Sequence, residues 1–277
     1  MIPPHTLKGR VSHMLGLALL AIVAACAPAI RPDKVPDSFA WFDLVTDRPE
    51  VAQDFYGAVF GWRFSDDPNS GAKVITGGNQ LIGGLVRIDR GDTASSSRWQ
   101  PVLTVADTQA AVKTSTGLGA HLVQGPVETP EGSFAVIRDN SRALLTLYDG
   151  QEGIPLAGPD RAGTWAWVDL FTNKPASAQR FYAGLSGFQA GTARDSAGQA
   201  FTVFTKDGVP RGGLVSVPAS QIEPNWLPYV LVRDLDQTIG KARELGASVL
   251  AREPGAAILL DPTGAAVGIV TPEGVGQ

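Results

Sequence analysis

Cysteine, histidine and clustered positive charge are scarce in this chain, and each shortage excludes a class of chemistry. Among 277 residues there are three histidines and one cysteine, Cys26. A single cysteine cannot form a disulfide within the chain, and no nucleophile with an adjacent base is visible. Charged residues make up 18%, the formal net charge is −4, and no run of Lys or Arg stands out. Because nucleic-acid binding needs a basic footprint, we expect no nucleic-acid partner.

The N-terminus carries a targeting pattern that is separate from the fold. Lys8 and Arg10 precede an apolar stretch over 14–25 that is shorter than the ~20 residues of a membrane-spanning helix. A charged region followed by an apolar one is typical of a secretory signal. We therefore expect residues 1–26 to be a signal peptide, followed by a Pro-rich tether over 27–37.

Cys26 gives this signal a more specific interpretation. The end of the apolar stretch, Ile-Val-Ala-Ala-Cys over 22–26, resembles a bacterial lipobox, in which the Cys becomes the lipidated first residue of the mature protein. The resemblance implies that Cys26 is a lipidation site and a membrane anchor. We expect a lipid-anchored protein of the bacterial cell envelope, facing the periplasm or the exterior. A plain signal peptide with an incidental Cys is the alternative.

The chain repeats itself. Ala-Trp-Phe-Asp-Leu-Val-Thr over 40–46 returns as Ala-Trp-Val-Asp-Leu-Phe-Thr over 166–172. A helix signal with a Phe-Tyr pair follows each copy, and Gly-Gly-Leu and Trp-x-Pro also occur in both halves. Such a long repeat indicates two copies of one module. We expect modules over 38–149 and 164–273, joined by a Gly- and Pro-rich linker over 150–163, each with β-α-β-β-β in duplicate.

Two local expectations concern element boundaries. Asp47 precedes Pro49, and we expect it to cap the first helix. We also expect strands over 101–105 and 229–232, so that Trp99 and Trp226 each precede a strand.

Taken together, the motifs resemble a known family. Asp-Leu-x-Thr, a Pro-started helix with Phe-Tyr, the Trp-x-Pro-Tyr segment over 226–229 and Asp-Pro-x-Gly over 261–264 look like the glyoxalase / bleomycin resistance / extradiol dioxygenase (vicinal oxygen chelate) superfamily. The resemblance covers nearly all of 39–272. It implies an α+β fold of two tandem modules, each of paired β-α-β-β-β units whose curved mixed sheet surrounds a cavity.

The metal site of that family is not matched. Metal-dependent members place His, Gln or Glu on the first strand and on the strand before the second helix, and a Glu on the last strand. Here the corresponding positions hold Ala or Trp, then Gln100 or Pro101 in one module and Leu or Pro in the other, and finally about Thr146 and Gly268. One amide oxygen does not hold a metal. We therefore predict no metal and no other cofactor.

Asp43 and Asp169 are the weak candidates for catalysis. Strand alternation places each on the same face as Trp41 or Trp167, so each module would offer an aromatic wall and one carboxylate to a ligand. A partly desolvated carboxylate has a raised pKa and can act as a general base. The alternative is a strand-end Asp that bonds loop amides.

Four further side chains are candidate ligand-binding residues. Trp99 and Trp226 can stack on a flat ligand or plug the ends of the modules. Arg211 and Tyr229 can contact a polar or anionic ligand. Alternatively, each is a solvated or capping group.

The first hypothesis for function is an envelope lipoprotein that binds a small aromatic or apolar molecule without metal, which resembles the drug-sequestering branch of the family. The second is a lyase, isomerase or dioxygenase-like enzyme that uses Asp43, Asp169 or an unconventional metal site. The third is a structural or partner-binding envelope protein whose cavities are filled by its own side chains. Fold does not decide between them.

Overall fold

The computed structural model describes residues 37–67, 72–89, 97–150, 161–194, 200–218 and 223–274. The signal peptide, Cys26 and all but the last residue of the tether lie outside these residues, as does most of the linker. No helix within the described ranges is long and apolar enough to cross a membrane.

The first module is one eight-stranded sheet with two helices. The strand order is β2-β3-β4-β1-β5-β8-β7-β6, and the central pair β1 and β5 is antiparallel. Its elements are β1 (Phe39–Thr46), α1 (Pro49–Phe60), β2 (Arg63–Asp66), β3 (Lys73–Gly77), β4 (Gln80–Arg87), β5 (Arg98–Thr104), α2 (Thr108–Gly117), β6 (His121–Thr129), β7 (Gly132–Arg138) and β8 (Leu144–Tyr148).

The second module repeats this topology strand for strand. Its sheet has the order β10-β11-β12-β9-β13-β16-β15-β14. The elements are β9 (Trp165–Thr172), α3 (Pro175–Ser186), β10 (Gln189–Arg194), β11 (Ala200–Lys206), β12 (Val209–Ser216), β13 (Asn225–Leu231), α4 (Leu235–Glu244), β14 (Ser248–Glu253), β15 (Ala256–Leu260), β16 (Ala266–Val270) and the short 3₁₀ helix η1 (Pro272–Gly274). The expected α+β fold with two modules of paired β-α-β-β-β units is confirmed.

Several local expectations were wrong. The strands β2 and β10, which follow the first helix of each module, have no sequence pattern that locates them, because their side chains are mostly exposed and lack an apolar alternation. Asp47 does not cap α1: the cap position is Arg48, without a side-chain hydrogen bond. In α2 the cap is Asp107, whose Oδ1 accepts from Ala110 N at 2.7 Å.

The Trp-x-Pro segments lie inside strands rather than before them. β5 begins at Arg98 and β13 at Asn225, so Trp99 and Trp226 are the second residues of central strands. The parallel ladder between β5 and β8 begins only at Val102. Pro101 lies before that ladder, so the lack of an N–H group in proline removes none of its hydrogen bonds.

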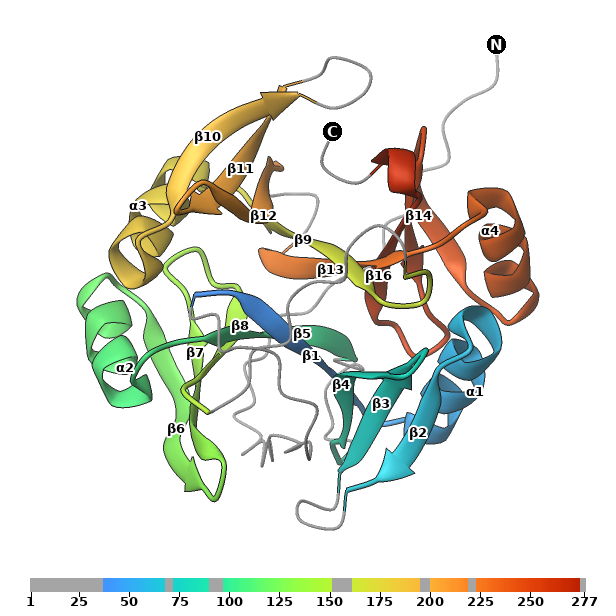
Figure 1. Cartoon of the computed structure of the whole chain (residues 1–277), viewed down its shortest axis with the longest axis horizontal. Helices are drawn as coiled ribbons and strands as arrows, with labels where there is room; N and C mark the ends of the chain where they lie inside the picture. Colours follow the sequence, from blue (N-terminus) through green and yellow to red (C-terminus); the bar gives the residue numbers. More distant parts are fainter. Residues whose placement is uncertain are drawn as a thin grey trace, which may run out of the picture.

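The two modules share one core on the helix-covered faces of both sheets. Figure 1 shows the modules face to face, with α2 beside α3 and α1 beside α4. Aromatic rings join them: the rings of Phe39 and Trp226 are 4.5 Å apart, and those of Trp99 and Trp165 are 4.9 Å apart at a steep angle. Such aromatic contacts contribute beyond the area that they bury.

Hydrogen bonds cross this core in equivalent places. In the second module Trp226 Nε1 donates to Tyr182 Oη at 2.8 Å, and Tyr182 donates to Asp139 Oδ2 of the first module at 2.8 Å. The other oxygen of Asp139 accepts three bonds from the β7–β8 turn, including Ala143 N at 2.9 Å. The tyrosine of one module is thereby tied to a turn of the other.

The reciprocal contact uses Tyr56 and Asp261. Trp99 Nε1 donates to Tyr56 Oη at 2.8 Å, and burial, then the charge of Asp261, raises the pKa of Tyr56 well above its usual value. A hydrogen bond to Asp261 contributes to this rise, yet Asp261 Oδ2 forms no close hydrogen bond with any residue that the structure describes. We infer that this second contact is longer and weaker than the one at Tyr182.

Replacing Tyr182 by Phe should lower the free energy of unfolding by about 2–4 kcal/mol, because it leaves the Asp139 carboxylate and the Trp226 N–H buried without their partner. Urea denaturation measures the free energy of unfolding of wild type, Tyr182→Phe and Tyr56→Phe. Tyr56→Phe is the matched comparison, and we expect it to lose less stability than Tyr182→Phe. A Tyr182→Phe variant as stable as the wild type would contradict the role given to this bond.

Candidate functional site

The candidate carboxylate of the first module lies on the sheet face opposite the helices. Trp41 Nε1 donates to Asp43 Oδ1 at 2.7 Å, and the Gly84 N–H of the neighbouring strand also bonds to this carboxylate. Asp43 is only 1% exposed. The expectation from alternation that Trp41 and Asp43 share a face is confirmed.

The second module repeats the pair and adds a tyrosine. Trp167 Nε1 donates to Asp169 Oδ1 at 2.7 Å, and the hydroxyl of Tyr229 also hydrogen-bonds to Asp169. Tyr229 comes from β13, where it stands opposite Trp167 of β9. The structure thus unites three sequence candidates, Trp167, Asp169 and Tyr229, in one hydrogen-bonded group.

Two glycines make room for this group. A Cβ at position 213 would lie 2.0 Å from Asp169 Oδ1, and one at position 268 would lie 2.2 Å from the Tyr229 ring. Gly268 stands where the family places its last-strand Glu, and Tyr229 now covers it. The glycine at 268 is a usable sequence signal, because it leaves space on the sheet, but only the strand pairing identifies Tyr229 as the residue that fills this space.

Burial raises the pKa of both carboxyl groups. The pKa of Asp43 rises to about 7, against the bonds from Trp41 and Gly84, which lower it. The pKa of Asp169 rises to about 6, with the bonds from Trp167 and Tyr229 opposing the effect of burial. Burial and then the charge of Asp169 raise the pKa of Tyr229, so its hydroxyl stays protonated and remains a donor.

The two faces differ in exposure and polarity. Both faces carry a half-buried Trp on an apolar cluster, Trp41 in the first module and Trp167 in the second. In the first module Asp43 is buried, and the polar side chains near it are paired with each other: Gln100 Nε2 donates to Thr146 Oγ1 at 2.8 Å. In the second module Asp169 is partly exposed, so only there can a ligand in solution touch both the aromatic surface and the carboxylate.

The other candidates lie elsewhere. Trp99 and Trp226 are 5% and 2% exposed, and their indole nitrogens bond to Tyr56 and Tyr182 in the shared core. Arg211 lies at a register shift between β11 and β12, and its Nε is buried without a hydrogen-bond partner. The structure therefore does not bring these three into the Trp167–Asp169–Tyr229 group, and a ligand contact for them stays a prediction.

The residues at the family's metal positions do not fit a divalent cation. Trp41, Gln100 and Thr146 stand at the three positions in the first module, and the Gln100 amide is engaged by Thr146. In the described part of the chain, no three His, Cys, Asp or Glu residues come close enough to hold a metal ion. His121 is exposed at the start of the edge strand β6. We derive no chemistry through a metal at these positions.

The family follows from a match that covers both modules. The family model of the glyoxalase-like domain matches residues 40–142 and again residues 165–270. The chain belongs to the glyoxalase-like domain family. In this glyoxalase-like protein the second matched segment spans the whole second sheet, and the first spans the first sheet up to β7, ending before β8.

Curated relatives point the same way. A protein of Mycobacterium tuberculosis, CFP32, whose name assigns it provisionally to the glyoxylases, is 26% identical over 217 residues, or 76% of this chain and 83% of the relative. The anthracycline biosynthesis protein DnrV of Streptomyces peucetius is 32% identical over 138 residues, which cover 44% of this chain and 45% of the relative.

Solved structures agree on the fold alone. The Mn(II)-bound glyoxalase of Novosphingobium aromaticivorans superposes with a TM-score of 0.57 at 13% identity, covering 86% of this chain and 82% of that one. Homoprotocatechuate 2,3-dioxygenase of Arthrobacter globiformis gives 0.58 at 16% identity, covering 90% and 83%.

The buried carboxyl group makes stability depend on pH. Because the pKa of Asp43 is about 7 in the folded state against an ordinary 3.8, the unfolded state loses its proton first as the pH rises. The contribution of Asp43 to stability is therefore full below pH ~4 and declines until pH ~7. Asp43→Asn should remove this decline.

The measurement is denaturant unfolding of both proteins near pH 4.5 and pH 7.5. The difference in free energy of unfolding between Asp43→Asn and wild type should shift in favour of the variant by on the order of 3 kcal/mol from the lower pH to the higher. Asp169→Asn is the comparison, with a smaller gain that is complete near pH 6, since Asp169 is partly exposed and has a lower pKa. An equal pH dependence in wild type and Asp43→Asn would contradict the raised pKa.

Proposed function

We propose that this glyoxalase-like protein is an envelope lipoprotein that binds a small aromatic or apolar molecule, without a metal, on the open face of its second module. The observation that carries the proposal is the group of Trp167, Asp169 and Tyr229, set in a half-exposed apolar face. A flat apolar body with one polar contact is what this group complements.

The physical argument rests on exposed aromatic surface. Trp167 and Phe171 are half-buried rather than buried, so part of each ring is in contact with solvent in the free protein. Covering such surface with a ligand is favourable by about 25 cal/mol per Å². The Trp167 and Tyr229 donors hold Asp169 in place, and its outer oxygen can accept from a ligand hydroxyl or amine.

Two further facts support this class of ligand. The metal-ligand positions carry groups unsuited to a cation, which favours binding by packing rather than by chelation. The relative DnrV is named for anthracycline biosynthesis, and anthracyclines are flat and polycyclic. We propose the same shape of ligand here, with no commitment to that compound class.

A second candidate function is supported by the carboxyl groups. A group whose pKa lies near 6 or 7 can take up a proton at neutral pH and give it back, as a general base must. Asp169 is the accessible one of the two, and its neighbours fix its orientation. Proton abstraction from a bound substrate, in a lyase or isomerase, is therefore the rival proposal.

Trp167→Ala should weaken binding of the ligand by at least about tenfold, because a central tryptophan of a binding face commonly carries that much of the affinity. The ligand is first sought in a thermal-shift screen of small aromatic metabolites and antibiotics against the full chain. Leu250→Ala, at an exposed apolar residue of the same sheet, is the control and should bind as wild type does.

Further measurements on the purified protein distinguish the three hypotheses for its function. Stoichiometric divalent metal in the purified protein, or binding abolished by a chelator, would overturn the metal-free proposal. Turnover of a bound compound that Asp169→Asn removes while binding persists would favour the enzyme. A protein that binds no compound of the screen, and whose Trp167→Ala variant loses stability or partners, would favour the structural role.

Cys26→Ser should release the protein from the membrane, since the acyl chains that hold a lipoprotein are attached to that cysteine. Cell fractionation with metabolic labelling by a fatty-acid analogue measures both the location and the modification. Label and membrane association that persist in Cys26→Ser would exclude the lipid anchor, whereas secretion of unlabelled wild-type protein would indicate a plain signal peptide.

A further inference from the structure

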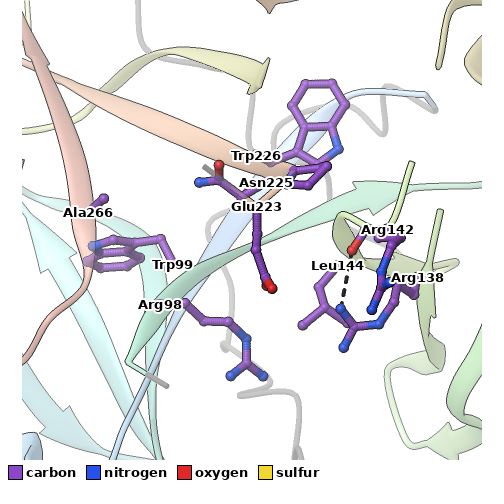
Figure 2. A pocket seen from close by; sticks show the side chains of 10 residues that line it. Arg98, Trp99, Arg138, Arg142, Leu144, Glu223, Asn225, Trp226 and Ala266 are labelled. Atoms are coloured by element: carbon purple, nitrogen blue, oxygen red, sulfur yellow. Dashed lines mark hydrogen bonds between the residues drawn. The ribbon is translucent and has the colours of Figure 1, made fainter. Parts of the chain in front are cut away.

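A pocket of about 160 Å³ lies where the two modules meet. Its walls come from the start of β5 and the β7–β8 turn of the first module, and from the start of β13 and β16 of the second. Figure 2 shows the side chains that line it. They are Arg98, Trp99, Arg138, Arg142, Leu144, Glu223, Pro224, Asn225, Trp226 and Ala266.

Three arginines line this small space in a protein of net negative charge. Burial, and then the neighbouring charge of Arg138, lowers the pKa of Arg98 to about 10, so the like charges interact. Within the described residues, no carboxylate forms an ion pair with Arg138 or Arg142. Arg138 instead donates from Nη1 to the carbonyl of Arg142 at 3.2 Å, which fixes its head group at the pocket.

The second module provides an internal comparison. By the repeat, Arg98, Arg138 and Arg142 correspond to Asn225, Leu260 and Gly264. The same strands and the same turn therefore form without any of the three charges. The fold does not require arginines at these places.

Arg142 makes this comparison sharper. Its φ is 90°, in the left-handed region that favours glycine, and its counterpart Gly264 has φ 98°. A non-glycine residue held there costs on the order of 1 kcal/mol. The first module thus keeps a long cationic side chain at a position where glycine is the favoured residue, and this exposed arginine is one of three that line the pocket.

We propose that this pocket is a binding site for a phosphate-type oxyanion, either free phosphate or the phosphate group of a small metabolite. Arg138 and Arg142 offer forked donors that match phosphate oxygens, and Asn225 adds an amide donor from the other module. Arg98, whose Nη2 donates to Gln100 Oε1 at 3.3 Å, adds its positive charge. Binding offsets the mutual repulsion of the arginines and joins the two modules through one ligand. The site is independent of the proposed function.

Glu223 acts against the ligand. Glu223 is one of the lining residues. In Figure 2 its carboxylate lies between Arg98 and Arg138. A bound oxyanion must share that space with a fixed negative charge. Removing the charge should therefore tighten binding, which is the opposite of what removing an arginine should do.

The experiment is isothermal titration of the full chain with inorganic phosphate, at low ionic strength. Arg142→Gly should weaken binding about tenfold while leaving the protein as stable as wild type or more so, because glycine suits the backbone at that position. Arg138→Gln should also weaken binding about tenfold, and Glu223→Gln should tighten it several-fold. Arg87→Gln, an exposed arginine ion-paired with Glu50 on the same module, should leave binding unchanged.

The outcomes are distinct. Phosphate that binds equally to wild type, Arg142→Gly and Arg138→Gln would overturn the proposal, as would a loss of affinity in Glu223→Gln. Phenyl phosphate, titrated in parallel, identifies the source: tighter binding than inorganic phosphate supports an ester as the ligand, and equal or weaker binding supports the free ion. No heat of binding and no protection from thermal unfolding with either compound would also overturn it.

Discussion

The exchange of hydrogen bonds between the two modules is the constraint on which the rest of the structure depends. Tyr182 receives a bond from Trp226 in its own module and gives one to Asp139 in the other. Asp139 at the same time organises the β7–β8 turn. One buried carboxylate thus couples the shape of a turn, the position of a helix and the docking of two sheets, so none of these can shift alone.

This coupling explains why the two open faces can differ although the modules repeat. The core faces carry the shared aromatic residues and must remain complementary. The opposite faces take no part in this contact, so their residues can differ between the modules. Both faces carry a half-buried Trp, but in the first module Asp43 is buried beside polar side chains, whereas in the second Asp169 is partly exposed and Tyr229 lies over Gly268. Duplication preserved the Trp-Asp pairs while their surroundings diverged.

The repeat in the sequence predicted two modules, and the family resemblance predicted their paired β-α-β-β-β units. Strand alternation, which is a local property, predicted that each Trp shares a face with its Asp. It failed where neighbours along the chain do not decide the outcome. Trp99 reads equally well as a ligand contact or a core residue until Tyr56 is seen beside it. The arginine pocket draws Arg98 and Arg138 from separate elements, and no spacing in the chain predicts their meeting.

The reciprocal arrangement of the cross-module contacts has an evolutionary consequence. Each module contains both a donor, Tyr56 or Tyr182, and an acceptor turn, Asp139 or Asp261. A polypeptide of half the length would therefore carry everything needed to complete both contacts with a second copy of itself. The interface is of the self-complementary kind that closes a twofold homodimer. Gene fusion would then have required only a connecting segment, and it would have freed the two halves to change independently.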